Sequence, residues 1–119
     1  MANARSAEYH PKGWGYEKWI SNTEKYCGKL LFFRKGKKCS YHSHIRKTET
    51  FYVQSGKLIL RYGNCDDLNK ATEIVLIPGD VFDVPPHLRH QMEALEDTEL
   101  FEFSTEHFEN DSYRAVKGD

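Results

Sequence analysis

The sequence predicts an all-β protein, folded as an antiparallel β-barrel or jelly roll with little helix. Six short runs rich in β-branched or aromatic residues are separated by Gly, Pro, Asn or Asp, as in folds made of many short strands. No window of useful length repeats apolar residues at helical spacing without a glycine, a proline or a β-branched cluster interrupting it. The chain of 119 residues, 39% of them hydrophobic, is long enough for one core.

The predicted strands follow one another at 25–36, 48–54, 57–63, 72–78, 80–85 and 98–104. The first carries the apolar run LLFF and ends at the glycine turn RKGKK. The second and third are joined by the tight turn QSGK, and a polar loop, 61–70, leads to the fourth. The proline and glycine of IPGD separate the fourth from the fifth, and the last, TELFEFS, alternates apolar and polar residues.

We expect a single domain over residues 1–119. It divides into an N-terminal arm, 1–24, a barrel, 25–105, and a polar tail, 106–119. The arm contains the aromatic segment WGYEKWI, and a strand-rich body has open sheet edges to cover. We therefore expect a homodimer in which edges are paired or aromatic residues are shared across a two-fold axis.

Composition and charge exclude several classes of partner. Seventeen basic and eighteen acidic residues give a formal charge of -1, so no overall field attracts nucleic acid or anionic lipid. The N-terminus lacks the apolar core of a signal peptide, and no stretch approaches the roughly 20 apolar residues of a membrane span. The three cysteines have no paired spacing, which favours free thiols. We expect a cytoplasmic protein with neither nucleic acid nor membrane as a partner.

Three histidines and a glutamate form the candidate metal site. Residues two apart on a strand share a face, so His42 and His44 project to the same side of the sheet. Glu49 opens the next strand on the side of its apolar residues, where a carboxylate is costly without a cation or a donor. His90 follows a turn-rich segment farther along the chain. Such a set suits a divalent transition metal, and does not distinguish Mn, Fe, Co, Ni and Zn.

These residues resemble the two sequence motifs of the cupin superfamily. The first motif, G-x5-H-x-H-x4-E-x6-G, is matched by Gly36, His42, His44, Glu49 and Gly56. The second, G-x5-P-x-G-x2-H-x3-N, is matched by Gly79, Pro85 and His90, with His87 in place of its second glycine and Ala94 in place of its asparagine. The resemblance implies a small β-barrel or jelly roll, often dimeric, whose internal metal is bound by His42, His44, Glu49 and His90.

A narrower resemblance extends toward both ends of the chain. The segments KGWGYEKWI, VLIPGDVFDVPPHLRHQMEAL and FEFSTEHFENDSYR look like parts of the cupin domain of type II phosphomannose isomerases. This resemblance implies a metal-dependent enzyme acting on a sugar or sugar phosphate, by aldose-ketose isomerisation as in mannose-6-phosphate isomerase. Its ligand would be a small carbohydrate.

The residues expected to assist such chemistry are basic or acidic side chains on strands near the histidines. Lys29 shares a face with two apolar residues of its strand, so it enters the cavity if they do, and it then binds phosphate or acts as a base. Arg61 and Glu93 are the other catalytic candidates. Further helpers are Arg34, Glu102 and His107. By default, however, His10 and His107 are read as surface or tail residues, and His87 as a second partner of the site or a residue of the barrel rim.

Three function classes remain open from the sequence. A polar cavity with a second carboxylate or lysine near the metal favours the sugar enzyme. A dry aromatic pocket lined by Phe33, Phe51 and Tyr52 favours an iron-dependent dioxygenase. An occluded or metal-free site favours a non-catalytic module that binds sugars or other small molecules.

Overall fold

The computed structural model describes residues 3–119 and confirms the all-β prediction. Over this range the chain forms eleven β-strands and one short 3-10 helix, η1 (Leu68–Lys70). The strands are β1 (Glu8–Lys12), β2 (Gly15–Asn22), β3 (Cys27–Phe33), β4 (Tyr41–Ser43), β5 (Glu49–Ser55), β6 (Leu58–Gly63), β7 (Thr72–Leu76), β8 (Val81–Val84), β9 (Arg89–Ala94), β10 (Thr98–Ser104) and β11 (Tyr113–Val116). Within residues 3–119, no helix is both long enough and apolar enough to traverse a membrane.

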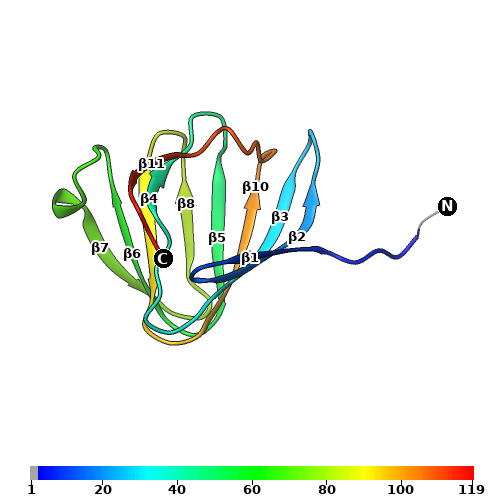
Figure 1. Cartoon of the computed structure of the whole chain (residues 1–119), viewed down its shortest axis with the longest axis horizontal. Helices are drawn as coiled ribbons and strands as arrows, with labels where there is room; N and C mark the ends of the chain where they lie inside the picture. The colour runs from blue at the N-terminus through cyan, green and yellow to red at the C-terminus, as the bar shows by residue number, and fades with distance from the viewer. Residues whose placement is uncertain (1–2) are drawn as a thin grey trace.

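Two antiparallel sheets make up the molecule, with the strands of both running between the same two ends (Figure 1). The six-stranded sheet has the order β1-β2-β3-β10-β5-β8, and the five-stranded sheet has the order β11-β4-β9-β6-β7. From β3 to β11 the chain crosses to the other sheet at nearly every connection. This crossing pattern is that of a jelly roll.

The end segments of the chain belong to the sheets. The expected arm supplies β1 and β2, which extend the six-stranded sheet beyond β3. The expected tail supplies β11, which pairs with β4 and places Arg114 opposite His42. Both segments therefore lie against the strand that carries the histidine pair or against the neighbours of β3.

The space between the sheets changes from apolar to polar along the strands. On β3 alternate residues face inward, and Leu31 and Phe33 are buried with Lys29 on that face, as the strand period predicted. On β10 the inward residues change in the same way, from Leu100 to Glu102, and Glu102 pairs in register with Lys29. One end of the sandwich is thus a closed apolar core, and the other end is lined by charged side chains.

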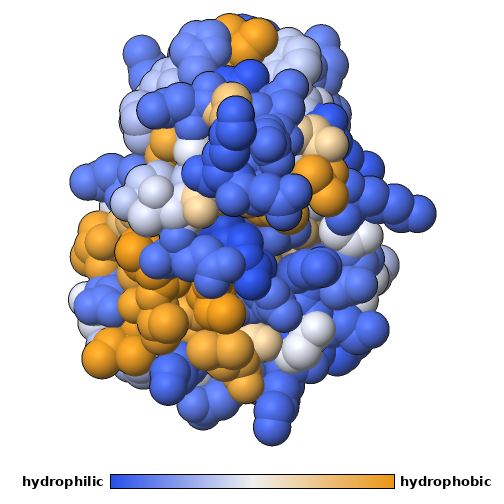
Figure 2. All heavy atoms as spheres, turned by 90° about the vertical axis from the view of Figure 1, so that its left-hand side faces the viewer, coloured by the Kyte–Doolittle hydropathy of each residue, from blue (hydrophilic) through white to orange (hydrophobic). Residues whose placement is uncertain are grey.

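Hydrophobic side chains also gather on the outside, on the β7 side of the molecule (Figure 2). Val75 on β7 is 51% exposed and Val81 on β8 is 58% exposed, and Ile77 between them is 51% exposed. Since β7 and β8 are each the outermost strand of a sheet, these side chains border two open sheet edges. We call Val75, Ile77 and Val81 the apolar edge.

Candidate functional site

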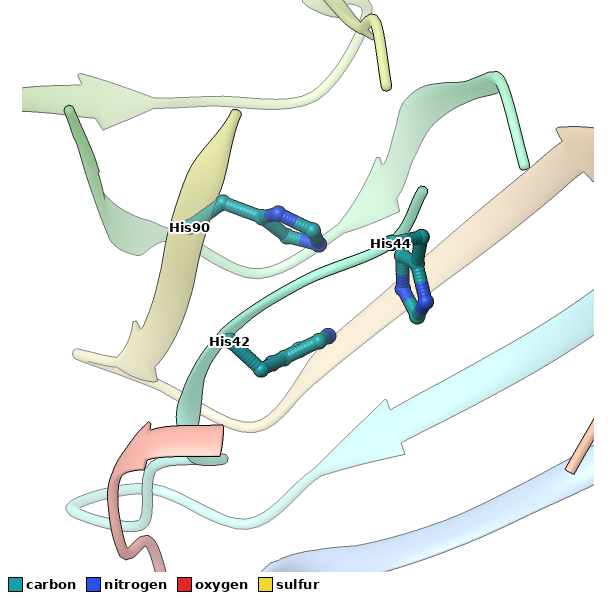
Figure 3. Close-up of side chains that lie close together, drawn as sticks. All are labelled: His42, His44 and His90. Atoms are coloured by element: carbon teal, nitrogen blue, oxygen red, sulfur yellow. The ribbon is translucent and has the colours of Figure 1, made fainter. Parts of the chain in front are cut away.

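Three imidazole rings converge at the polar end of the sandwich (Figure 3). His42 lies on β4 and pairs in register with His90 on the adjacent β9, and His44 follows directly after β4. One ring nitrogen from each residue lies within 4.8 Å of those of the other two, which is close enough for the three to share a metal ion. The prediction that His42 and His44 face the same side is confirmed, since their ring centroids are 5.0 Å apart.

Each of the three rings presents its Nδ1 to a backbone carbonyl oxygen. The contacts are His42 Nδ1 to Ser40 O at 2.8 Å, His44 Nδ1 to Asp111 O at 2.7 Å, and His90 Nδ1 to Leu88 O at 3.0 Å. A carbonyl oxygen only accepts, so Nδ1 carries the proton and donates it. Each Nε2 is then an acceptor with a free lone pair, which is the tautomer that metal-binding histidines use.

The Glu49 carboxylate faces the same space and has no donor of its own there. Its Oε1 lies 3.3 Å from Nε2 of both His44 and His90, and the side chain is 2% exposed. Among residues 3–119, Glu49 Oε1 and His90 Nε2 are buried without a hydrogen-bond partner. Buried polar atoms are rarely left in this state. Lone pairs that face one another at this distance fit a cation placed between them.

The electrostatics of the cluster keep its groups in the forms that a cation needs. Burial lowers the pKa of His42 well below its ordinary value, and the neighbouring His90 and His44 lower it further. Burial works against ionisation of Glu49, but contacts with His44 and His90 and the charge of Lys47 hold its pKa well below the usual range. At neutral pH the site therefore offers a neutral imidazole and an ionised carboxylate.

Next to the cluster lies a buried network centred on Lys47. Its Nζ is 3.3 Å from Glu49 Oε2, 3.2 Å from Glu102 Oε2 and 3.1 Å from His107 Nδ1. Burial and the charge of Glu49 raise the pKa of Glu102, although Lys47 acts in the opposite direction. Burial and the charges of Lys29 and Lys47 lower the pKa of His107 to about 3, so its ring is neutral and accepts from Lys47.

The cluster and the network line one cavity of about 180 Å³. Since a water molecule occupies about 30 Å³ in the liquid, this volume admits a small organic molecule. Trp14, Phe33 and Phe51 contribute aromatic wall, while the remaining lining is dominated by charged and imidazole side chains. The cavity is therefore mainly polar.

The structure sorts the predicted helper residues into two groups. Lys29, Glu102 and His107 line the cavity. The default interpretation of His107 as a surface or tail residue is wrong, because it packs against Lys47 and edge-on to Trp19. Its backbone N–H also donates to the Asn22 side chain, which docks the tail on β2.

Arg61 and Glu93, expected among the catalytic residues, lie outside the cavity lining. They pair with each other at 2.8 Å, and Arg61 also reaches Glu73 at 3.1 Å. The reason is the two-residue period of a strand. Because Leu60 on β6 and Met92 on β9 point into the core, the residues that follow them point to the outer face of the five-stranded sheet. The structure thus corrects the expected placement of Arg61 and Glu93.

Two residues of the site region were not foreseen from the sequence. Lys47 carried a usable signal, since it precedes Glu49 by two residues and so has the same parity. Asp111 carried none. Its carboxylate accepts hydrogen bonds from the backbone N–H groups of residues 45–47, while its carbonyl accepts from His44. Only the fold brings residue 111 to this loop.

His87, which occupies a glycine position of the second motif, adopts a conformation that glycine prefers. Its φ is 73°, whereas the other residues with positive φ among residues 3–119 are all glycines. Its backbone N–H donates to His44 O at 2.6 Å, linking the turn before His90 to the residue that follows β4. The turn is therefore formed with histidine in the glycine conformation.

Comparison with known proteins agrees with this architecture. The family model described as cupin domain matches residues 30–104. Capsular polysaccharide assembling protein CapF from Staphylococcus aureus superposes with a TM-score of 0.80 at 24% identity, over 93% of this chain and 33% of that one. KdgF from Halomonas sp. superposes with a TM-score of 0.73 at 21% identity, over 87% and 91% of the two chains.

A third similar structure is oxalate decarboxylase from Bacillus subtilis, with a TM-score of 0.79 at 16% identity, over 96% of this chain and 33% of that one. At these identities the likeness concerns the fold. This chain spans about a third of the length of the CapF and oxalate decarboxylase chains. The search of curated proteins finds no match.

Proposed function

This chain belongs to the cupin domain family, and from that premise we propose that it is a metal-dependent enzyme acting on a small sugar or sugar phosphate. His42, His44, His90 and Glu49 would hold one divalent transition-metal ion. The single observation that carries the proposal is the arrangement of lone pairs. Three imidazoles whose Nδ1 atoms face carbonyl oxygens turn Nε2 toward one buried carboxylate oxygen that lacks a partner.

The reaction class that the cavity supports best is aldose-ketose isomerisation. A bound metal would supply Lewis acidity toward the hydroxyl and carbonyl oxygens of the sugar. The conversion moves a proton between C1 and C2 of the sugar, so it needs a side chain that holds a proton near neutral pH. Glu102 suits this role because it lines the cavity and its pKa is raised by burial and by Glu49.

The remaining side chains of the network would position and tune that carboxyl group. Ser104 Oγ donates to Glu102 Oε2 at 2.8 Å, and Lys47 Nζ lies 3.2 Å from the same oxygen. These donors leave Oε1 as the oxygen available to accept or release a substrate proton. The resemblance to type II phosphomannose isomerases, which rests on sequence alone, supports the same class of reaction.

The aromatic wall of Trp14, Phe33 and Phe51 is the feature that would favour iron-dependent dioxygenase chemistry instead. Tyr52, which the dioxygenase alternative also required, has the opposite strand parity to Phe51 and is absent from the lining. Charged groups cover much of the rest of the cavity. We therefore place isomerisation ahead of oxygen chemistry.

The test combines metal analysis with a substrate screen. The purified protein, as isolated and after loading with Mn, Fe, Co, Ni or Zn, would be incubated with aldoses and their phosphates, and ketose formation followed by NMR. We expect turnover that depends on metal and falls by about 10²- to 10⁴-fold in Glu102→Gln with metal content retained. Glu99→Gln, on the same strand but facing outward, is the matched control.

Metal binding without turnover of any sugar would support the non-catalytic module. Dioxygen consumption by the iron-loaded protein would support the dioxygenase. Glu102→Gln with unchanged turnover would remove the proposed proton carrier.

We also propose a homodimer formed through the apolar edge. Val75, Ile77 and Val81 present exposed hydrophobic side chains beside two open sheet edges, a combination that favours pairing with a second copy. Light scattering at micromolar concentration should then give twice the monomer mass of 13.9 kDa. Val81→Lys should shift the mass to that of the monomer. A wild-type mass near 13.9 kDa would contradict the dimer.

A further inference from the structure

Two lysines are buried in the wall of the cavity, which is unusual for this residue type. Lys29 is 2% exposed and Lys47 is 3% exposed. An ammonium group has three N–H donors, and burying it is costly unless acceptors compensate. The two lysines meet this requirement very differently.

Lys47 has an acceptor for each of its three N–H groups. Glu49, Glu102 and His107 each place one acceptor within 3.3 Å of Nζ. The pKa of Lys47 is accordingly raised in spite of its burial, through the charges of Glu102 and Glu49. Its donors are used within the protein, so it has none left for a ligand.

Lys29 does not have such a set of acceptors. In the part of the chain that the structure describes, its one carboxylate partner is Glu17, whose Oε1 is 3.7 Å from Nζ, beyond hydrogen-bond distance. That oxygen already accepts the Trp19 indole N–H at 2.8 Å. The ammonium lies over the Trp19 ring at 4.4 Å from its centroid, a contact that uses the charge but no acceptor atom.

The cavity around Lys29 has room for an acceptor and an electrostatic reason to take a charged one. Its charged lining consists of four basic residues, Lys12, Lys29, Lys47 and Arg114, and four acidic residues, Glu17, Glu49, Glu102 and Glu109. With a divalent cation on the histidine cluster, the balance becomes two positive charges. A ligand that carries an oxyanion restores neutrality.

We propose that Lys29 and the face of Trp19 form a subsite for the oxyanion of a sugar-sized ligand, either a carboxylate or a phosphate. The subsite completes the donors of a buried ammonium with charge-assisted hydrogen bonds. The inference rests on the proposed function to the extent that the ligand occupies the same cavity. It deepens that function by selecting acidic sugars over neutral ones.

Calorimetric binding measurements on the metal-loaded full chain test the subsite. The probes are D-gluconate, D-glucose 6-phosphate, neutral D-glucose and inorganic phosphate alone. We expect at least one acidic sugar to bind about 10-fold or more tightly than D-glucose, as one charged hydrogen bond supplies. Gluconate and glucose 6-phosphate distinguish the carboxylate from the phosphate, and inorganic phosphate shows whether the sugar is required.

The variants are Lys29→Met, which keeps the stem and removes the charge, Lys29→Arg, which keeps the charge, and Lys70→Met on the exposed η1 as the matched control. Lys29→Met should lose the preference for the acidic sugar, and the other two should retain it. Thermal unfolding and metal content verify that Lys29→Met is folded.

Two outcomes overturn the subsite: a wild-type protein without preference for either acidic sugar, or a folded Lys29→Met variant that keeps the preference. If Lys29→Met does not fold, Lys29→Gln replaces it in the same comparison. A preference that depends on Lys29 in a protein without turnover would support the subsite and contradict the isomerase.

Discussion

Replacing His42 or His90 with alanine is expected to weaken divalent-metal binding by about 10- to 100-fold or more, since even the loss of groups behind the ligands reaches that range. Both rings have Nδ1 against a backbone carbonyl and Nε2 toward the shared space, so their removal deletes a lone pair without disturbing another proposed ligand. Calorimetric titration with Zn or Mn gives the dissociation constant directly. At saturating metal, a 100-fold loss also removes about 2.7 kcal/mol of metal-dependent stabilisation.

The matched control for these variants is His10→Ala. His10 lies on β1, where its ring stacks on Trp19 at a centroid distance of 4.0 Å, outside the histidine cluster. Its removal should leave metal stoichiometry unchanged. Full stoichiometric metal in His42→Ala or His90→Ala would mean that the converging rings serve another purpose.

The largest loss of stability without metal is expected from Lys47→Met. Glu49 and Glu102 are 2% and 3% exposed, and Lys47 is the ammonium that contacts both. Removing one partner of a buried ionic network leaves uncompensated charge and typically costs about 3–5 kcal/mol. Urea unfolding of the metal-free protein should show a decrease of this size in the free energy of unfolding.

A second substitution separates the charge effect from lost packing. Adding Glu102→Gln to Lys47→Met removes one of the stranded carboxylates, so the double variant should be more stable than additivity of the two single variants allows. Lys70→Met, at an exposed position, should change stability by no more than about 0.5 kcal/mol. A cost below about 1 kcal/mol for Lys47→Met would show that the network contributes little.

Local spacing was sufficient to predict the parts of the site that lie on single strands. The two-residue period placed His42 with His44 and placed Lys29 inside with Leu31, and the structure has both arrangements. The inward position predicted for Glu49 is confirmed by its burial. In these cases the neighbours along the strand are apolar, so the burial of one face determines where the polar residue points.

The errors and omissions come from relations that spacing does not express. Arg61 and Glu93 were assigned by their nearness in sequence to the motifs, although their parity opposes that of the core residues beside them. His107 and Asp111 belong to a segment without apolar periodicity. Their positions depend on hydrogen bonds to residues more than 60 positions away. Pairings of this length follow from the completed fold and leave no local pattern.

The carbonyl and carboxylate of Asp111 give the C-terminal segment a thermodynamic link to the histidine cluster. His44 keeps its orientation through the Asp111 carbonyl, and the Asp111 carboxylate holds the backbone of residues 45–47, which leads to Glu49. Docking of the segment therefore orients two of the proposed ligands. By reciprocity, any ion that binds the oriented ligands more tightly also favours the docked segment by the same free energy. Metal supply would then set how often residues 106–119 open, and with them one wall of the cavity.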